Sequence, residues 1–380
     1  MITTIADACE LITDGTHYTP QDVGVGVPFL TVKDVGPNGL DFEGAAKISA
    51  EEYQRAKAGN SAPQKGDVLF SKDGTVGKVQ IVEGDSPFAV LSSLAILRPK
   101  ENVDARYLAH ALRSPAAMDQ AARRKTGSAI RRIILSDLAR VSVPLPPLND
   151  QRRIAAILDH ADALRAQRRC VIDALHRLAG SVFSRLVNVV DEFSQLGEVA
   201  DFFAGGSLPP GEPFAGQSGG YFHMKVSDMN RPGNETTIRS CAEWSDVPGP
   251  RSATCPAGSI VIPKRGGAIS TNKKRVTLRP TVLDPNLMAV HPRDGLSLCY
   301  LKAWFDQFDL NTIVSGSSVP QLNKRDLAPL AIPVPSAEAQ SLVTELTSSM
   351  DHRLDRARLS LAMHEELSDS LQARAFSGQL

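Results

Sequence analysis

The sequence predicts an α+β protein in which two similar mixed α/β globular lobes are separated by two long antiparallel helices, forming a pseudo-twofold internal repeat. Residues 126–151 recur as residues 315–340, at an offset of 189 and without a gap. Each copy continues into about forty residues with no Pro and almost no Gly, where apolar residues recur at helical spacing. These patterns indicate a duplicated unit made of one lobe and one long helix.

The repeat extends over most of the chain. Its further matching segments are residues 5–16 with 196–207, residues 66–74 with 258–266, and Tyr107 with Tyr300. The offset changes only from 191 to 193 across these segments. Small insertions in loops therefore separate two copies of one fold.

The predicted boundaries follow from this repeat. They are a first lobe at 1–148, a first long helix at 149–190, a second lobe at 191–335 and a second long helix at 336–380. Short apolar runs between Gly, Asp and Pro residues are typical of strands within the lobes. The first lobe closes with residues 141–148, whose prolines favour an extended segment.

The two long helices each carry one apolar stripe and therefore need a partner, which we expect to be the other helix in a coiled coil. The stripe residues are Ile154, Leu158, Leu164, Val171, Leu175, Leu178, Val182, Val343, Leu346, Met350, Leu354, Leu361 and Leu371. The copies match at an offset of 189 where the helices start, but Phe183 matches Phe376 at 193. The second helix is therefore expected to be one turn longer, or about 6 Å.

Composition limits the possible functions. Lys plus Arg and Asp plus Glu are both 42, so the net charge is zero and bulk charge alone does not explain nucleic-acid binding. The five cysteines are scattered without a CxxC pair, which favours a reduced compartment over a zinc site. With neither a signal peptide pattern nor a run of 18 apolar residues, the protein is expected to be cytoplasmic and not bound to a membrane.

Basic residues cluster near the repeated Gly-Ser motif of the first lobe, and a second cluster lies in the second lobe. Clustered Lys and Arg beside Gly, Ser and Thr suit phosphate contacts and hydrogen bonds to base edges. A solvated basic surface is the alternative for either cluster. The loop at 14–20 could meet a base edge or simply be closed by its own hydrogen bonds, and the turn at 72–78 lacks the spacing of a phosphate-binding loop.

Base contacts are expected mainly within residues 126–132 and 315–324. The full set of candidate DNA-binding residues is Thr16, His17, Lys72, Lys78, Arg123, Arg124, Lys125, Thr126, Ser128, Arg131, Arg132, Lys264, Arg265, Lys273, Lys274, Arg275, Ser315, Ser317, Ser318, Gln321, Asn323 and Lys324. The sequence contains no GxGxxG, HExxH or Asn/Asp-Pro-Pro-Tyr/Phe motif. We therefore expect neither a catalytic centre nor a metal site on this chain.

Several motifs resemble those of the DNA-specificity (S) subunits of type I restriction-modification systems. The matching segments are residues 12–17, residues 66–78, the Pro-rich exit with its following helix start at 143–154, and the C-terminal residues 375–380. Departures occur where the family usually has Glu-Gln at the helix start, because this chain has Asp150-Gln151 and Ala339-Gln340. The second copy also carries Gly206-Ser207 and Arg265-Gly266 in place of Asp-Gly-Thr.

The resemblance implies a non-catalytic subunit in which each lobe is a target-recognition domain that reads one half of a bipartite double-stranded DNA sequence. It implies that the helices fix the spacing and dock two methyltransferase subunits, which carry S-adenosylmethionine. Restriction subunits using ATP with Mg would join for cleavage, unless the system only methylates. The alternative from a different class is a duplicated, non-enzymatic protein-interaction scaffold with a helical spacer.

Overall fold

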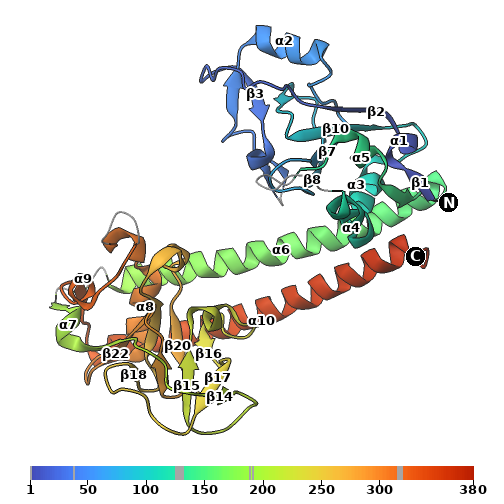
Figure 1. Cartoon of the computed structure of the whole chain (residues 1–380). Coiled ribbons are helices and arrows are strands. Elements are labelled where there is room, and N and C mark those ends of the chain that lie inside the picture. Colours follow the sequence, from blue (N-terminus) through green and yellow to red (C-terminus); the bar gives the residue numbers. More distant parts are fainter. Residues whose placement is uncertain (1, 37–38, 125–131, 188–189, 191, 315–319) are drawn as a thin grey trace. The chain divides into compact units, whose positions relative to one another are not determined.

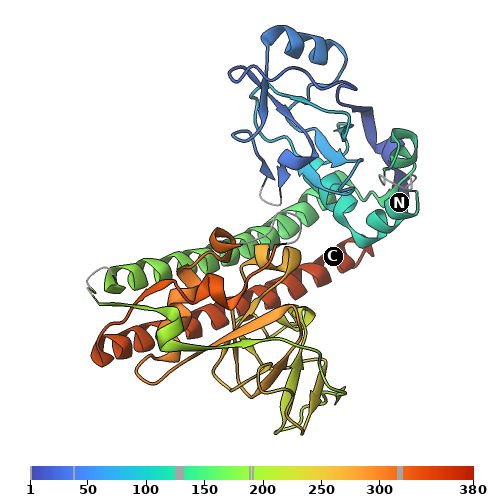
Figure 2. The same cartoon turned by 60° about the vertical axis from the view of Figure 1, so that its left-hand side comes forward.

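The computed structural model describes residues 2–36, 39–124, 132–187, 190, 192–314 and 320–380. It forms two compact units: unit 1 is Met1–Cys170 with Arg358–Leu380, and unit 2 is Val171–Ala357. The boundary between units falls inside both long helices, whereas the sequence placed boundaries where lobes meet helices. The predicted α+β class, with two mixed α/β parts and two long helices, is confirmed (Figures 1 and 2).

Unit 1 is built on an antiparallel sheet in the order β2-β10-β7-β8. Its strands are β2 (Cys9–Asp14), β7 (Val68–Ser71), β8 (Val79–Ile81) and β10 (Leu94–Pro99). A second sheet contains β3 (Val27–Leu30), β6 (Ala46–Ile48) and β9 (Ala89–Val90), and strand pairs join β1 (Ile2–Thr4) to β11 (Ser142–Pro144) and β4 (Val35–Gly36) to β5 (Gly39–Leu40). The helices of this unit, besides the long ones, are α1 (Ile5–Ala8), η1 (Val32–Asp34), α2 (Ala50–Ala58), α3 (Ala105–Arg113), α4 (Pro115–Arg123) and α5 (Leu135–Ala139).

The central strand β10 separates two parts of the core of unit 1. Ala95 and Leu97 pack in one apolar cluster together with α3, and Leu94 and Ile96 pack in another. This alternation follows from the two-residue period of a strand buried on both faces. Helix α3 is fixed at its start by Asp104, whose side chain accepts hydrogen bonds from the first turn.

Unit 2 has two five-stranded sheets. The first, in the order β13-β22-β19-β20-β16, contains β13 (Ala200–Ala204), β16 (Thr237–Ile238), β19 (Ile260–Pro263), β20 (Arg275–Thr277) and β22 (Leu287–Pro292). The second, in the order β14-β17-β15-β21-β18, contains β14 (Glu212–Pro213), β15 (Tyr221–Met224), β17 (Glu243–Ser245), β18 (Thr254–Cys255) and β21 (Thr281–Leu283). A strand pair, β12 (Phe193–Gln195) with β23 (Ala331–Pro333), corresponds to β1 with β11. The remaining elements are α7 (Leu196–Val199), η2 (Val226–Asn230), η3 (Gly266–Thr271), α8 (Leu298–Gln307), η4 (Leu310–Ile313) and α9 (Lys324–Leu327).

The duplication is visible in individual hydrogen bonds. Tyr107 donates its hydroxyl to Pro144 O at 2.9 Å, and Tyr300 donates to Pro333 O at 2.7 Å. Both ring systems are fully buried. In each unit the same contact therefore links one helix, α3 or α8, to the Pro-containing segment that precedes the long helix.

A buried glutamine fixes the start of each long helix. Gln151 accepts from Asp104 N at 2.9 Å and donates to Asn102 O and Pro146 O. Gln340 likewise accepts from Ser297 N at 2.7 Å and donates to carbonyls of Gly295 and Pro335. Both amides are therefore occupied inside their own unit.

The long helices are α6 (Leu148–Val187) and α10 (Ala337–Phe376), each of 40 residues. The prediction that the second helix is longer overall is therefore wrong. The four additional residues do lie between the start of α10 and Phe376, but α6 continues past Phe183 to Val187, which restores equal length. Within unit 1 the beginning of α6 packs against the end of α10, and within unit 2 the end of α6 packs against the beginning of α10, so the pairing is antiparallel in each.

The predicted stripe is buried at some positions and not at others. Ile154, Leu158, Val343 and Leu354 are at most 4% exposed. The stripe positions Leu164, Leu175, Val182, Leu346, Met350, Leu361 and Leu371 are half-buried. Val171 and Leu178 are 37% and 52% exposed, more than any other member of the stripe. They follow Leu164 in steps of seven, and such a series rotates by about 20° per step on a straight α-helix, away from the buried face.

Candidate nucleic-acid interface

An ion-pair cluster lies where strands β2 and β7 of unit 1 end. Lys72 Nζ is 3.1 Å from Asp14 Oδ2 and 3.5 Å from Asp73 Oδ2, with the lysine side chain 11% exposed. His17 Nε2 is 3.3 Å from Asp14 Oδ1, and its side chain is 79% exposed. Lys72 is therefore already neutralised by carboxylates, whereas His17 is accessible to a ligand.

The turn between β7 and β8 is fixed by its backbone and by its neighbours. Lys78 Nζ donates to Val32 O at 2.9 Å and to Val35 O at 2.7 Å, which places this predicted DNA-binding residue in a structural contact. Gly77 has φ of +102°, and a Cβ there would lie 2.0 Å from Met118 Cε. Helix α4, which carries Met118, thus packs closely on the turn.

The same pair of backbone contacts, a β-bridge and a neighbouring hydrogen bond, occurs in both units. In unit 1, Asp73 and Arg132 form an antiparallel bridge, and Ile133 N donates to Lys72 O at 2.9 Å. We call residues 72–78 with 132–133 the hairpin edge of unit 1. In unit 2, Arg265 and Gln321 form the equivalent bridge, and Leu322 N donates to Lys264 O at 2.9 Å. Arg132 and Ile133 therefore contact their sheet at the place that corresponds to Gln321 and Leu322 in unit 2.

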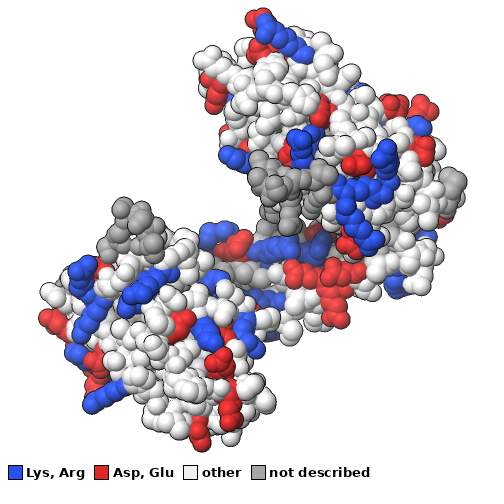
Figure 3. Space-filling view, in the orientation of Figure 1, with Lys and Arg blue, Asp and Glu red and all other residues white. Residues whose placement is uncertain are grey.

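Part of the predicted interface lies outside the described residues. These candidates are Lys125, Thr126, Ser128, Arg131, Ser315, Ser317 and Ser318. The described neighbours of the first group include Arg123 and Arg132, which are exposed, and Arg124, which is half-buried and donates to Gln120 O at 3.0 Å. Several Lys and Arg side chains gather on the face of unit 1 that includes α3 and α4 (Figure 3).

The predicted basic cluster of unit 2 divides into accessible and buried members. Arg265 is exposed, and Lys264 is half-buried with its pKa lowered by burial and by the charge of Arg265. Lys274 is 5% exposed, and its amine donates to Phe308 O at 2.7 Å and to Asn272 Oδ1 at 2.8 Å. Lys273 bonds to Asn230, and Arg275 donates to Lys274 O. These residues do not form one continuous free patch.

The remaining candidates also separate into two groups. Thr16 is 8% exposed and its hydroxyl donates to Tyr18 O at 2.8 Å, as the alternative of a self-closed loop predicts. Gln321 donates to Asn323 Oδ1 at 2.9 Å. Lys324 is exposed and lies 5.7 Å from the ring centre of Phe202. Among the candidates that the structure describes, the most accessible are His17, Arg123, Arg132, Arg265 and Lys324.

Sequence reasoning missed a set of polar contacts between α3 and α6, which includes His110, Arg113, Asp159 and Asp162. Charged residues on a predicted helix usually face solvent, so these residues gave no signal individually. The available signal was the equal spacing of three residues between the two members on each helix. Within the described ranges, no group of three or more His, Cys, Asp or Glu residues could hold a metal ion. No helix of the same ranges is long and apolar enough to cross a membrane.

Comparison with known proteins agrees with the duplicated architecture. Residues 2–173 match the sequence model of the type I restriction modification DNA specificity domain. The first part of the chain is therefore similar to this domain. A putative type I restriction enzyme specificity subunit of Haemophilus influenzae is 34% identical over 120 residues, which cover 31% of this chain and 30% of that protein. The match to the EcoBI specificity subunit of Escherichia coli covers 37% of that relative, so the chain matches less than two thirds of these two proteins.

Other relatives extend the similarity over the second copy. A putative MjaX specificity subunit of Methanocaldococcus jannaschii is 21% identical, with 99% of this chain and 92% of the relative covered. The crystal structure of a type I restriction-modification S subunit from M. genitalium has a TM-score of 0.56 at 15% identity and covers 99% of this chain and 96% of that one. A chain of a type I restriction-modification complex has a TM-score of 0.53 at 17% identity, with 100% and 98% covered. At these identities the two structures support the fold. The curated relatives named here are described as type I restriction enzyme specificity subunits.

Proposed function

We propose that this chain is the sequence-specific DNA-binding subunit of a type I restriction-modification complex, with each unit reading one half of a bipartite target. One observation carries the proposal: the backbone contacts of the hairpin edge, with basic residues beside them, occur in both units, in a chain whose residues 2–173 match the DNA specificity domain. Two linked readers multiply specificity because the second half-site is bound intramolecularly. The two edges differ in side chains, as two different half-sites require.

We propose that methyltransferase subunits dock on the long helices. An apolar groove of about 460 Å³ lies between α6 and α10 of unit 1. It is lined by Arg153, Ala156, Ile157, His160, Ala161, Leu164, Leu367 and Leu371. Leu359, Met363 and Leu367 are 48% to 65% exposed and recur every four residues, so they share a face of α10. Such an exposed apolar stripe is typical of a protein-binding surface.

In this proposal the chemistry belongs to the partners. The methyltransferase subunits bind S-adenosylmethionine, and restriction subunits bind ATP with Mg where cleavage occurs. This chain selects the sequence, and the cytoplasm, where the DNA substrate lies, is its place of action. The net charge of zero is compatible with this division, because the partners can add phosphate contacts.

The test is to co-express the chain with its modification subunit and to sequence the methylated bases in the DNA. We expect one bipartite sequence to be methylated. Replacing residues 1–148 with the lobe of another family member should change one half of that sequence only. An unaltered target after this replacement would contradict the proposal.

A separate measurement distinguishes a protein-interaction scaffold from a DNA reader. Arg123→Ala with Arg132→Ala should weaken DNA association and reduce the slope of log affinity against log salt by about one per lost phosphate contact. Asp119→Ala, at another exposed position of α4, is the control. If the slope of log affinity against log salt is unchanged in the variant with both Arg123→Ala and Arg132→Ala, the scaffold is favoured.

A further inference from the structure

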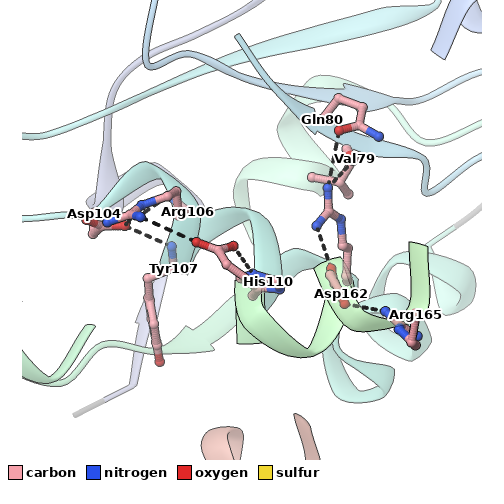
Figure 4. Close-up of polar contacts among 10 residues, drawn as sticks. Val79, Gln80, Asp104, Arg106, Tyr107, His110, Asp162 and Arg165 are labelled. Carbon is pink, nitrogen blue, oxygen red and sulfur yellow. Dashed lines mark hydrogen bonds and ion pairs between the residues drawn. The ribbon is translucent and has the colours of Figure 1, made fainter. Parts of the chain in front are cut away.

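Helix α3 of unit 1 is attached to α6 by two polar contacts that are three residues apart on both helices (Figure 4). His110 Nε2 lies 2.8 Å from Asp159 Oδ1, and Arg113 Nη1 lies 3.8 Å from Asp162 Oδ2. Residues three apart lie on the same face of a helix. The two contacts together therefore restrict both sliding and rotation of α3 on α6.

The His110 contact is buried. The residue is 1% exposed, and burial lowers its pKa despite the hydrogen bond to Asp159. Arg106 supports the same carboxylate, with Nη1 3.4 Å from Asp159 Oδ2. Asp159 is thus held between two side chains of α3.

Arg113 also reaches the sheet. Its Nη2 donates to Val79 O at 2.7 Å and lies 3.4 Å from Gln80 Oε1 in strand β8 (Figure 4). Gln80 in turn donates to Gly36 O at 2.7 Å. A guanidinium can make these contacts together because its donors form a rigid planar fork. One side chain therefore links α6, α3 and β8.

The strand that Arg113 holds leads directly to the hairpin edge. Val79 pairs with Phe70 of β7, and the carbonyl of Lys72, two residues after Phe70, accepts the hydrogen bond from Ile133 N. Helix α4 begins two residues after Arg113 and places Met118 against Gly77 of the same turn. A shift of Arg113 would therefore move both supports of the edge.

The second copy lacks this linkage. At the 193-residue offset, Asp306 occupies the position of Arg113 and Ala303 that of His110. Asp306 pairs with Lys302 of its own helix at 2.6 Å. The guanidinium of Arg113 therefore has no counterpart at the corresponding position of the described part of unit 2.

We propose that Arg113, held by Asp162, is a positioning residue that sets the hairpin edge of unit 1 relative to the spacer helix and thereby sharpens reading of the first half-site. This inference rests on the proposed function. Arg113 acts through Val79 and the turn, and makes no DNA contact itself. Its loss should therefore affect discrimination between sequences more than the number of phosphate contacts.

The experiment uses the full chain assembled with its modification subunit. The first half-site is defined as the one that changes when residues 1–148 are replaced. Methylation rates are measured on the target and on targets with one base pair changed in either half. Arg113→Gln and Asp162→Asn should each reduce first-half discrimination about tenfold or more, because small misplacements of positioning groups have large effects on rate. Second-half discrimination and the salt slope should stay unchanged.

Matched variants separate positioning from general destabilisation. Lys302→Gln breaks the ion pair of the corresponding helix in unit 2 and should leave first-half discrimination unchanged. Arg113→Lys keeps the charge beside Asp162 but loses the fork, so an intermediate effect is expected in a folded chain, verified by thermal unfolding. Full first-half discrimination in Arg113→Gln, or an equal loss in both halves, would overturn the inference. Failure of the wild-type complex to methylate any bipartite sequence would instead overturn the proposed function.

Discussion

At the scale of single residues, burial decides which basic side chains can meet a phosphate. The sequence places Lys273, Lys274 and Arg275 together, but it does not show that Phe308 and Asn272 accept hydrogen bonds from the Lys274 amine. Gln151 and Gln340 show the same limit: the repeat identifies them, but two of the three partners of each lie more than forty residues away. Residue type and spacing predict a candidate, whereas the direction of its side chain depends on distant parts of the chain.

Lys274 offers a prediction for pH dependence. Burial lowers its pKa from 10.5 to about 8, so the folded state releases the proton first as pH rises. Between these values the unfolded state binds more protons, and stability conferred by this site therefore rises with pH. In Lys274→Met this rise should be absent. Denaturant unfolding of the variant and the wild type is measured at about pH 7.5 and at about pH 9.5, and the difference in stability between the two proteins should change from one pH to the other. Lys273→Met is the control, and an equal difference at both pH values for Lys274→Met would contradict the prediction.

At the scale of elements, periodicity predicted α6 and α10 well because apolar spacing and the absence of Pro are local properties. Their equal length was not predicted, because where α6 ends beyond Phe183 depends on packing in unit 2. The second five-stranded sheet of unit 2 was also missed. Several of its strands have two or three residues, and such short segments carry little periodic signal.

The exposed stripe of α10 supports a prediction about assembly. Met363→Glu and Leu367→Glu place a charge on side chains that are 63% and 48% exposed, so the fold should be retained. Each should weaken capture of the methyltransferase subunit by about tenfold or more, because a buried unpaired charge is costly at an interface. Co-purification and titration of the two subunits measure this effect. Ser370→Glu, an exposed position of the same helix, should leave capture unchanged, and normal capture by Leu367→Glu would exclude this stripe as the docking surface.

At the scale of the whole molecule, each compact unit packs an aromatic ring from the end of a long helix against its own buried tyrosine. Phe376 packs on Tyr107 in unit 1 with ring centres 5.7 Å apart, and Phe183 packs on Tyr300 in unit 2 at 5.5 Å. Ala375 is 3% exposed within the same core as Tyr107. The repeat relates these pairs to one another, since 107 corresponds to 300 and 183 to 376. The last turns of α10 are therefore part of the core of unit 1.

This arrangement predicts that damage to the last turns of α10 destabilises unit 1 selectively. Phe376→Ala removes a half-buried ring and should lower the stability of unit 1 by about 2 kcal/mol, somewhat less than truncation of a fully buried Phe. Hydrogen exchange should then speed up in α3 around Tyr107 and remain unchanged in α8 around Tyr300. Phe183→Ala should give the reverse pattern, with the larger effect, because Phe183 is 6% exposed. Faster exchange of both helices in either variant would mean that the two units unfold as one cooperative body rather than as the two compact units that their contacts define.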